Sequence, residues 1–127
     1  MNAVRGTVNS KSELGLRIRV RGPSGCEMEF DAIVDTGFTG DLLLPIAIVQ
    51  MLELLPRGSI DAALADGTRI RSQAFGADVD WGGIYRRAVV SAIGNSPMIG
   101  LNLVHGHRLE ADIVAGGEVV VRPIPLN

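Results

Sequence analysis

An aspartate at the end of an apolar segment is the residue of this sequence best suited to acid–base chemistry. Ile33 and Val34 lead into Asp35, and Thr36 and Gly37 follow it directly. A strand of this kind delivers a carboxylate into a tight turn, where a threonine hydroxyl can satisfy a backbone group and glycine permits close backbone approach. A carboxylate held in this way can take up or give a proton during catalysis. The alternative is an ordinary turn that the aspartate only caps.

The residues after this turn extend the pattern over most of the chain. Three features follow in order: a continuation over residues 38–45 that ends in three leucines and a proline, the pair Asp66-Gly67, and a second apolar run into glycine, Met98-Ile99-Gly100. From about residue 14 to residue 121 the sequence therefore resembles the retroviral-type (retropepsin-like, clan AA) aspartic proteases, and most closely their bacterial single-domain relatives. The resemblance implies an all-β fold, namely a retropepsin-like acid-protease barrel with one or two short helices and one lobe per chain.

The resemblance implies a role for each residue of the turn. Asp35 corresponds to the catalytic aspartate. Thr36 matches the threonine whose hydroxyl supports its loop against the loop of a partner subunit, and Gly37 matches the glycine whose backbone lies beside the carboxylates. Phe38 stands where many relatives have a small residue, so it either lines a substrate pocket or belongs to the core. Leu101 stands where viral members carry arginine, and the support which that arginine gives the dimer is absent here.

Two further elements are implied to serve the site. Asp66 and Gly67 fall where the family has its flap, a hairpin that closes over bound peptide. The tip of this hairpin has a single glycine and a charged residue, which bears on substrate choice or on flap mobility. Ile99 and Gly100 match the element that packs behind the catalytic loop. Residues 40–41 differ from the viral pattern.

The activity implied by the resemblance is that of an aspartic endopeptidase. Amide hydrolysis needs a base that activates water and an acid that protonates the carbonyl oxygen or the leaving amine, and two carboxylates that share one proton can supply both. The sequence holds one Asp-Thr-Gly, so the second carboxylate must come from Asp35 of another copy, in a homodimer with two-fold symmetry. The expected partners are this second copy and a peptide or protein substrate. No cofactor and no metal are expected.

Other functions remain open at this point. A non-catalytic peptide-binding or dimerisation module of the same fold would use the groove without assembling the pair of Asp35 side chains. A small-ligand carrier built on a β-barrel would fit the apolar composition. His105 and His107 share one face of an alternating segment, but no third ligand is compelling, and a loop after a helix is the better interpretation.

The composition excludes several classes of protein. Hydrophobic residues make up 46% and charged residues 20% of the 127 residues, which is typical of a globular chain and suits one domain over residues 1–127. A net charge of −2 and 4% aromatic residues give neither the basic surface nor the stacking platforms of a nucleic-acid-binding protein. No apolar run reaches the roughly 20 residues that a membrane-spanning helix needs. With one cysteine and no signal-peptide pattern, the chain is expected to be cytoplasmic.

Alternating apolar residues predict the strands that would position Asp35. Residues 13–20 and 28–34 alternate around a turn at 22–25, which indicates a hairpin that ends at Asp35. The Asp-Gly pair predicts a second hairpin, formed by residues 60–65 and 68–75. Further strands are predicted over residues 79–81, 84–93, 108–114 and 118–121.

Two segments favour helix. Residues 46–55 begin after Pro45 and end before Pro56, and their apolar residues cover nearly every face, which predicts a largely buried helix. Residues 99–104 are predicted to form one or two helical turns.

Overall fold

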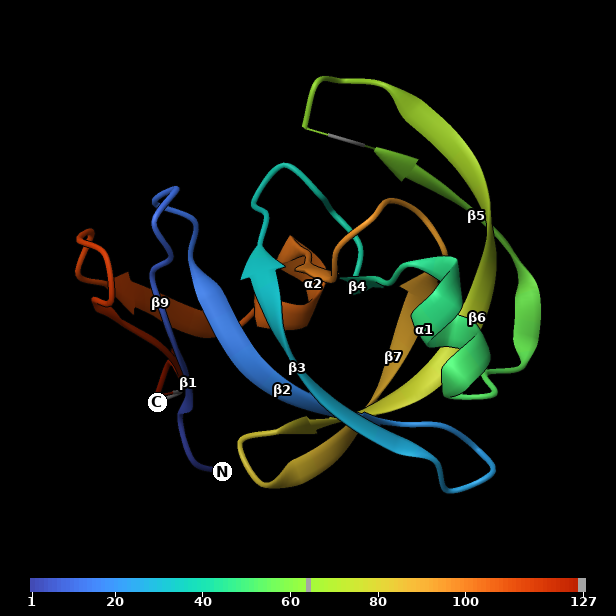
Figure 1. Cartoon of the computed structure of the whole chain (residues 1–127), viewed down its shortest axis with the longest axis horizontal. Helices are drawn as coiled ribbons and strands as arrows, with labels where there is room; N and C mark the ends of the chain where they lie inside the picture. Colours follow the sequence, from blue (N-terminus) through green and yellow to red (C-terminus); the bar gives the residue numbers. More distant parts are fainter. Residues whose placement is uncertain (64, 126–127) are drawn as a thin grey trace.

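The computed structural model describes residues 1–63 and 65–125 and is mostly β (Figure 1). Two short helices, α1 (Ile46–Met51) and α2 (Leu101–Val104), lie between strands. The strands are β1 (Val4–Thr7), β2 (Gly15–Arg21), β3 (Glu27–Val34), β4 (Leu42–Leu43), β5 (Pro56–Ala63), β6 (Arg69–Trp81), β7 (Ile84–Ser91), β8 (Met98–Ile99), β9 (His107–Ala111) and β10 (Glu118–Pro123). None of the described helices has the length and hydropathy that crossing a membrane requires. The all-β class predicted from the sequence is confirmed.

Six strands close into a barrel. Their order around the ring is β2, β3, β8, β4, β7 and β6, and β6 then pairs with β2 to complete it. The closing register sets Val20 of β2 opposite Val79 of β6, and both side chains are buried. β5 pairs with the first part of β6. These two segments extend beyond the ring as a hairpin that arches over one end of the barrel (Figure 1), while the second part of β6 belongs to the ring.

The β2–β3 hairpin shows why the sequence folds in this way. Leu16, Ile18 and Val20 alternate with Arg17 and Arg19, and the structure buries the first three while it exposes the two arginines. Because successive side chains of a strand point to opposite faces, the apolar set enters the barrel and the charged set faces solvent. This predicted hairpin is confirmed, and its second strand ends one residue before Asp35.

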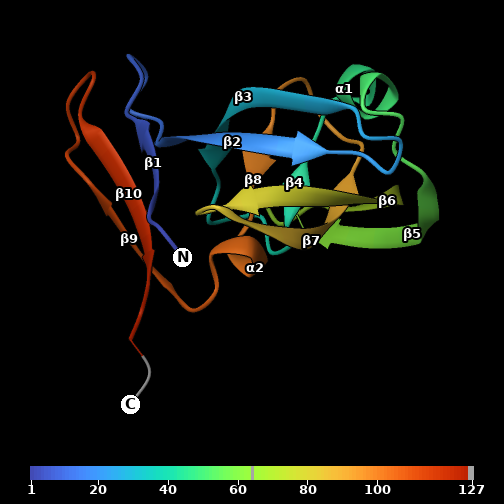
Figure 2. The same cartoon turned by 90° about the horizontal axis from the view of Figure 1, so that it is seen from below.

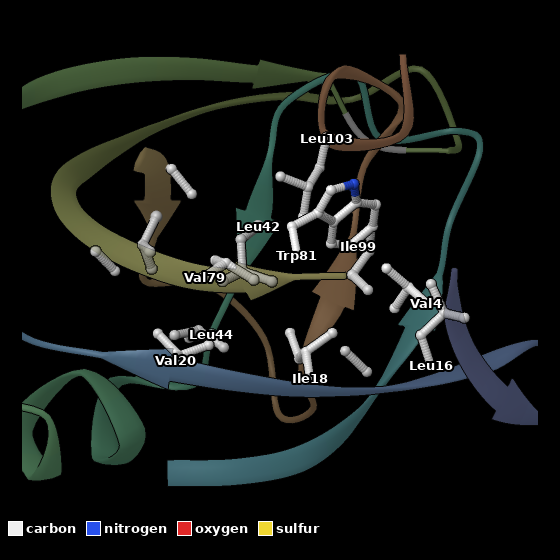
Figure 3. Packing of buried hydrophobic residues seen from close by; sticks show 14 of the residues in the cluster. Val4, Leu16, Ile18, Val20, Leu42, Leu44, Val79, Trp81, Ile99 and Leu103 are labelled. Carbon is white, nitrogen blue, oxygen red and sulfur yellow. The ribbon is translucent and has the colours of Figure 1, made fainter. Parts of the chain in front are cut away.

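The core lies inside the barrel and draws on almost every strand. Ile18, Leu42, Val79 and Ile99 come from four different strands and are fully buried together (Figure 3). Burying a side chain of this size stabilises a fold by roughly 1.5–3 kcal/mol. The barrel is therefore a packed support for the loops at its ends.

A smaller sheet of β1, β10 and β9 stands beside the barrel (Figure 2). Trp81, at the end of β6, is buried and donates an indole N–H to Nε2 of His107 at 3.1 Å. Nδ1 of His107 lies 2.9 Å from the carbonyl oxygen of His105, so the ring donates there and accepts from Trp81. His107 thus begins a strand and links the two sheets, where a loop was expected. β1 was not predicted.

The predicted buried helix over residues 46–55 is wrong in length and in burial. α1 ends at Met51 and buries only Val49, while Ile46 and Met51 are exposed. Six residues make fewer than two turns, so a single position faces the barrel. Leu52 and Leu54, which follow the helix, enter the core together with Val49.

The strand predicted over residues 79–81 is the end of β6, which runs without a break for 13 residues. β7 lies antiparallel to it from Ile84 to Ser91, and Gly82 and Gly83, both at positive φ, make the turn between them. Residues 108–114 were predicted as one strand, but β9 ends at Ala111, and Ile113 and Val114 are exposed after it.

Candidate active site

Asp35 is delivered by a strand that is fixed along its length. Ile33 and Val34 of β3 lie parallel to Met98 and Ile99 of β8. The backbone N–H of Asp35 continues this ladder and donates to the carbonyl oxygen of Ile99 at 2.8 Å. The position of the Asp35 backbone is therefore set by the core.

The turn after β3 also fixes the Asp35 side chain. The backbone N–H of Gly37 donates to Oδ1 of Asp35 at 2.9 Å, and the N–H of Phe38 donates to the Asp35 carbonyl oxygen at 3.1 Å. Asp35 is half-buried, and within the described part of the chain its Oδ2 accepts no hydrogen bond. One carboxylate oxygen is anchored and the other is available to a water molecule or a substrate. Thr36 is exposed beside it.

The tip of the β5–β6 hairpin lies against this loop. A Cβ atom added to Gly37 would come within 2.6 Å of the Ala65 Cβ and 2.7 Å of the Ala65 Cα. Glycine is therefore required at position 37 by this close approach, which holds without any positive φ. Residues 35–41 form the aspartate loop. This loop and the hairpin are distant in sequence, and they meet at Gly37 and Ala65.

Asp66 and Gly67 form the turn at this tip, as predicted, and both are exposed. The backbone N–H of Thr68 donates to Oδ1 of Asp66 at 2.8 Å, and Gly67 has φ +86°. The Thr68 hydroxyl and then its backbone N–H hold the pKa of the Asp66 carboxyl below its ordinary value. The carboxylate therefore stabilises the turn in its charged form.

Phe38 is a core residue, which decides between its two predicted roles. It is 1% exposed and packs with Leu43, Ile93 and Met98. A Cβ on Gly40 would come within 2.6 Å of its ring, and so would a Cβ on Gly100. The large side chain is accommodated because glycine stands at both positions, and Phe38 supports the loop from behind.

Ile99 and Gly100 lie behind the aspartate loop, as expected. Ile99 is buried, and the N–H of Gly100 donates to the Asp41 carbonyl oxygen at 2.9 Å. The next N–H, that of Leu101, donates to the Phe38 carbonyl oxygen at 2.8 Å. The start of α2 is thus joined to residues 38–41 by backbone hydrogen bonds.

Asp41 is a supporting residue whose role sequence reasoning missed. Its Oδ2 accepts the backbone N–H of Val89 at 2.8 Å, and its Oδ1 accepts the side-chain amide of Asn102 at 2.5 Å. One carboxylate therefore joins the aspartate loop to β7 and to α2. Leu101 is exposed, so this part of the structure is held by Asp41 and Asn102 and not by a side chain at position 101.

An open pocket of about 290 Å³ borders Asp35. Ile33 and Met98 form part of its wall, and the loop between β1 and β2 contributes Ser12, Glu13 and Leu14. This loop was not assigned to the site from the sequence, because nothing local connects it to residue 35. The contact follows from the hairpin register and from the N–H of Val34, which donates to the Leu14 carbonyl oxygen at 2.8 Å.

A second open pocket, of about 270 Å³, lies on the outer face of β2. Its lining includes Arg17, Arg19 and Glu29, and both arginines already form ion pairs with Glu29. The arginines of this pocket are therefore already held in ion pairs, whereas the pocket beside Asp35 adjoins a carboxylate oxygen that no described residue bonds. The described residues contain no group of three or more His, Cys, Asp or Glu side chains that could hold a metal.

Comparisons of the chain with protein-family models, with curated proteins and with solved structures found no match. What Asp35 can do therefore follows from its own surroundings. These are a carboxylate with one oxygen anchored and the other without a partner among the described residues, an adjoining pocket, and a hairpin tip that touches the same loop.

Proposed function

We propose that this chain is an aspartic endopeptidase, and that its barrel with the β5–β6 hairpin is one lobe of a retropepsin-like homodimer. The observation that carries the proposal is the geometry of Asp35. Its backbone is tied to β8, its Oδ1 accepts the Gly37 N–H, and its Oδ2, which no described residue bonds, lies beside an open pocket. An aspartate that only capped a turn would need neither the pocket nor the hairpin tip against its loop.

The second carboxylate would be Asp35 of another copy. The sequence holds one Asp-Thr-Gly, and a two-fold axis beside the loop would set the two Asp35 side chains against each other. Thr36 is exposed on this loop, where its hydroxyl is free to bond to the partner loop. Close carboxylates cannot both ionise easily, so the pair keeps one proton.

Such a pair carries out hydrolysis without a covalent enzyme intermediate. The ionised carboxylate takes a proton from water as the water oxygen bonds to the peptide carbon, and the protonated carboxyl gives its proton to the carbonyl oxygen. The resulting tetrahedral intermediate collapses: the C–N bond breaks as the leaving nitrogen takes the proton that the first carboxylate received from water. One hydroxyl of the intermediate returns a proton to the other carboxylate, which restores the pair. The β5–β6 hairpin would cover the substrate during these steps.

Cleavage of a diverse peptide library by the wild type and by Asp35→Asn, from acidic to neutral pH with mass-spectrometric readout, tests the proposal. Asparagine keeps an oxygen for the Gly37 N–H, so the loop should stay folded while the proton chemistry is lost. We expect wild-type cuts that disappear in Asp35→Asn. Asp31→Asn is the matched control, because Asp31 is an exposed carboxylate on β3, the strand that leads to Asp35, and should be dispensable.

Wild-type cuts that persist in Asp35→Asn would refute the assignment of Asp35. If a folded wild-type protein makes no cuts at any pH, the alternative of a peptide-binding or dimerisation module with the same groove is favoured.

A further inference from the structure

We propose that the pocket beside Asp35 selects a peptide side chain with an apolar stem and a cationic end, with Glu13 as its specificity-determining residue. This inference rests on the proposed peptidase function, because it names the class of substrate. Peptides with lysine or arginine next to the cleaved bond would be preferred.

The size and walls of the pocket suit one long side chain. Its volume of about 290 Å³ lies at the lower end of the range for ligand pockets, about 300–1,000 Å³, so it has room for a side chain and not for a folded partner. Leu14, Ile33 and Met98 supply apolar wall. The methylene stem of a lysine or arginine buries itself on such a surface while its charged end stays near polar groups.

The charged residues that line the pocket, among those described, are acidic. Glu13 and Asp35 both line it, and none of the lining residues that the structure describes is basic. In the described part of the chain neither carboxylate forms an ion pair. A cation in the pocket would meet the Glu13 carboxylate, which no described side chain neutralises, beside the Asp35 pair, whereas an acidic side chain would be repelled.

Hydrogen bonds within the β1–β2 loop hold Glu13 in place. Oδ1 of Asn9 accepts the backbone N–H groups of Lys11 and Glu13 at 2.9 and 3.0 Å. The Asn9 side-chain amide in turn donates to Oε1 of Glu13 at 2.9 Å. Since one side chain fixes both the backbone and the carboxylate, Glu13 is positioned before a substrate arrives, which lowers the entropy cost of binding.

The experiment compares three peptides that carry lysine, norleucine or glutamate at the position before the cleaved bond and are otherwise identical. Their common sequence comes from a peptide that the wild type cuts in the library. For a partly buried ion pair we expect kcat/KM to be about tenfold higher for lysine than for norleucine, and lowest for glutamate. In Glu13→Gln the ratio of kcat/KM for lysine to kcat/KM for norleucine should fall to about twofold or less.

Glu13→Gln keeps an oxygen for the Asn9 amide, so the loop should stay folded, and the circular-dichroism spectrum and urea unfolding of the variant check this. Glu27→Gln is the matched control, because Glu27 stands at the far end of β3 from Asp35 and is exposed. It should leave the lysine preference unchanged. An equal rate for lysine and norleucine in the wild type, or a preference that survives in Glu13→Gln, would overturn this inference and leave the peptidase intact.

If no peptide is cut, the peptidase function is refuted. A binding experiment then tests whether the pocket prefers a cationic side chain. Because no cut peptide then supplies the common sequence, two alanine-based peptides that differ only in a central lysine or norleucine are used. Their dissociation constants for the wild type are measured by fluorescence anisotropy, over the range from micromolar to millimolar. Tighter binding of the lysine peptide that is lost in Glu13→Gln supports the cationic pocket. Equal dissociation constants, or no detectable binding of either peptide, overturn it.

Discussion

Gly100 is the residue at which one added methyl group should do most damage to the site. A Cβ there would lie 2.1 Å from the Gly40 carbonyl oxygen and 2.6 Å from Cδ2 of Phe38, and both belong to the aspartate loop. Since backbone must move to make room, we expect Gly100→Ala to lower the free energy of unfolding by about 2–3 kcal/mol. Urea unfolding measures this change, and peptide cleavage should fall with it.

Gly94→Ala is the comparison for Gly100→Ala. Gly94 has φ +81° but nothing within 4 Å of an added Cβ, so it carries only the cost of a left-handed conformation, about 1 kcal/mol. Equal losses of stability in the two variants would show that contact with the aspartate loop is not what makes glycine necessary at position 100.

Single residues were predictable from the sequence where their role depends on neighbours in the chain. Asp35 and Gly37 stand together in one turn, and Asp66 and Gly67 in another, so their types and order indicated the turns. Asp41 was missed as a supporting residue, because its carboxylate bonds to Val89, which is far along the chain and adjacent only through the pairing of β4 with β7.

At the level of the element, the β5–β6 hairpin should loosen at its tip in acid. The Thr68 hydroxyl and backbone N–H hold the pKa of Asp66 below its ordinary value of about 3.9. Because the pKa is lower in the folded state, this stabilisation is fully present above the ordinary pKa and is lost as the pH falls through the folded pKa. The chemical shift of the Thr68 amide proton, followed from pH 6 downward, should titrate within that acidic window.

Asp66→Asn should abolish the titration of the Thr68 amide, since asparagine accepts the same hydrogen bond without a proton equilibrium. The Gly25 amide, which donates to the Gly22 carbonyl oxygen, should show no such step in either protein. A Thr68 titration that is unchanged in Asp66→Asn would mean that another group controls the tip.

Hairpins were the elements most predictable from the sequence, because alternation and turn residues are local signals. The burial of α1 was not predictable in this way. An apolar run can be buried as helix, as strand or as the chain that follows a helix, and here Leu52 and Leu54 enter the core while Met51 is 62% exposed. The length of β6 was also not predictable from the sequence. Residues 69–75 pair with β5 and the end of the strand pairs with β2, and the second pairing joins segments that are distant in sequence.

In the whole molecule, the decisive contacts join segments that are distant in sequence. The β2–β6 register closes the barrel, and the parallel β3–β8 pairing sets Asp35 against Ile99. Neither pairing can be inferred from local periodicity. The alternation therefore predicted most of the longer strands, whereas the barrel was expected only from the resemblance. The closed ring also holds the proposed catalytic loop at one end of a rigid barrel, a suitable place for a site completed by a second copy.

A site shared between two chains makes the activity of one chain depend on its partner. If wild type and Asp35→Asn exchange subunits freely, an equal mixture contains about one quarter wild-type dimers, so the activity per wild-type chain falls to about half. Titration of wild type with Asp35→Asn at constant wild-type concentration, after an incubation that permits exchange, should show this inhibition. Addition of Asp31→Asn should instead add activity. If Asp35→Asn leaves the wild-type rate unchanged although the two chains co-sediment as mixed dimers, each chain acts alone and the two-carboxylate mechanism is wrong.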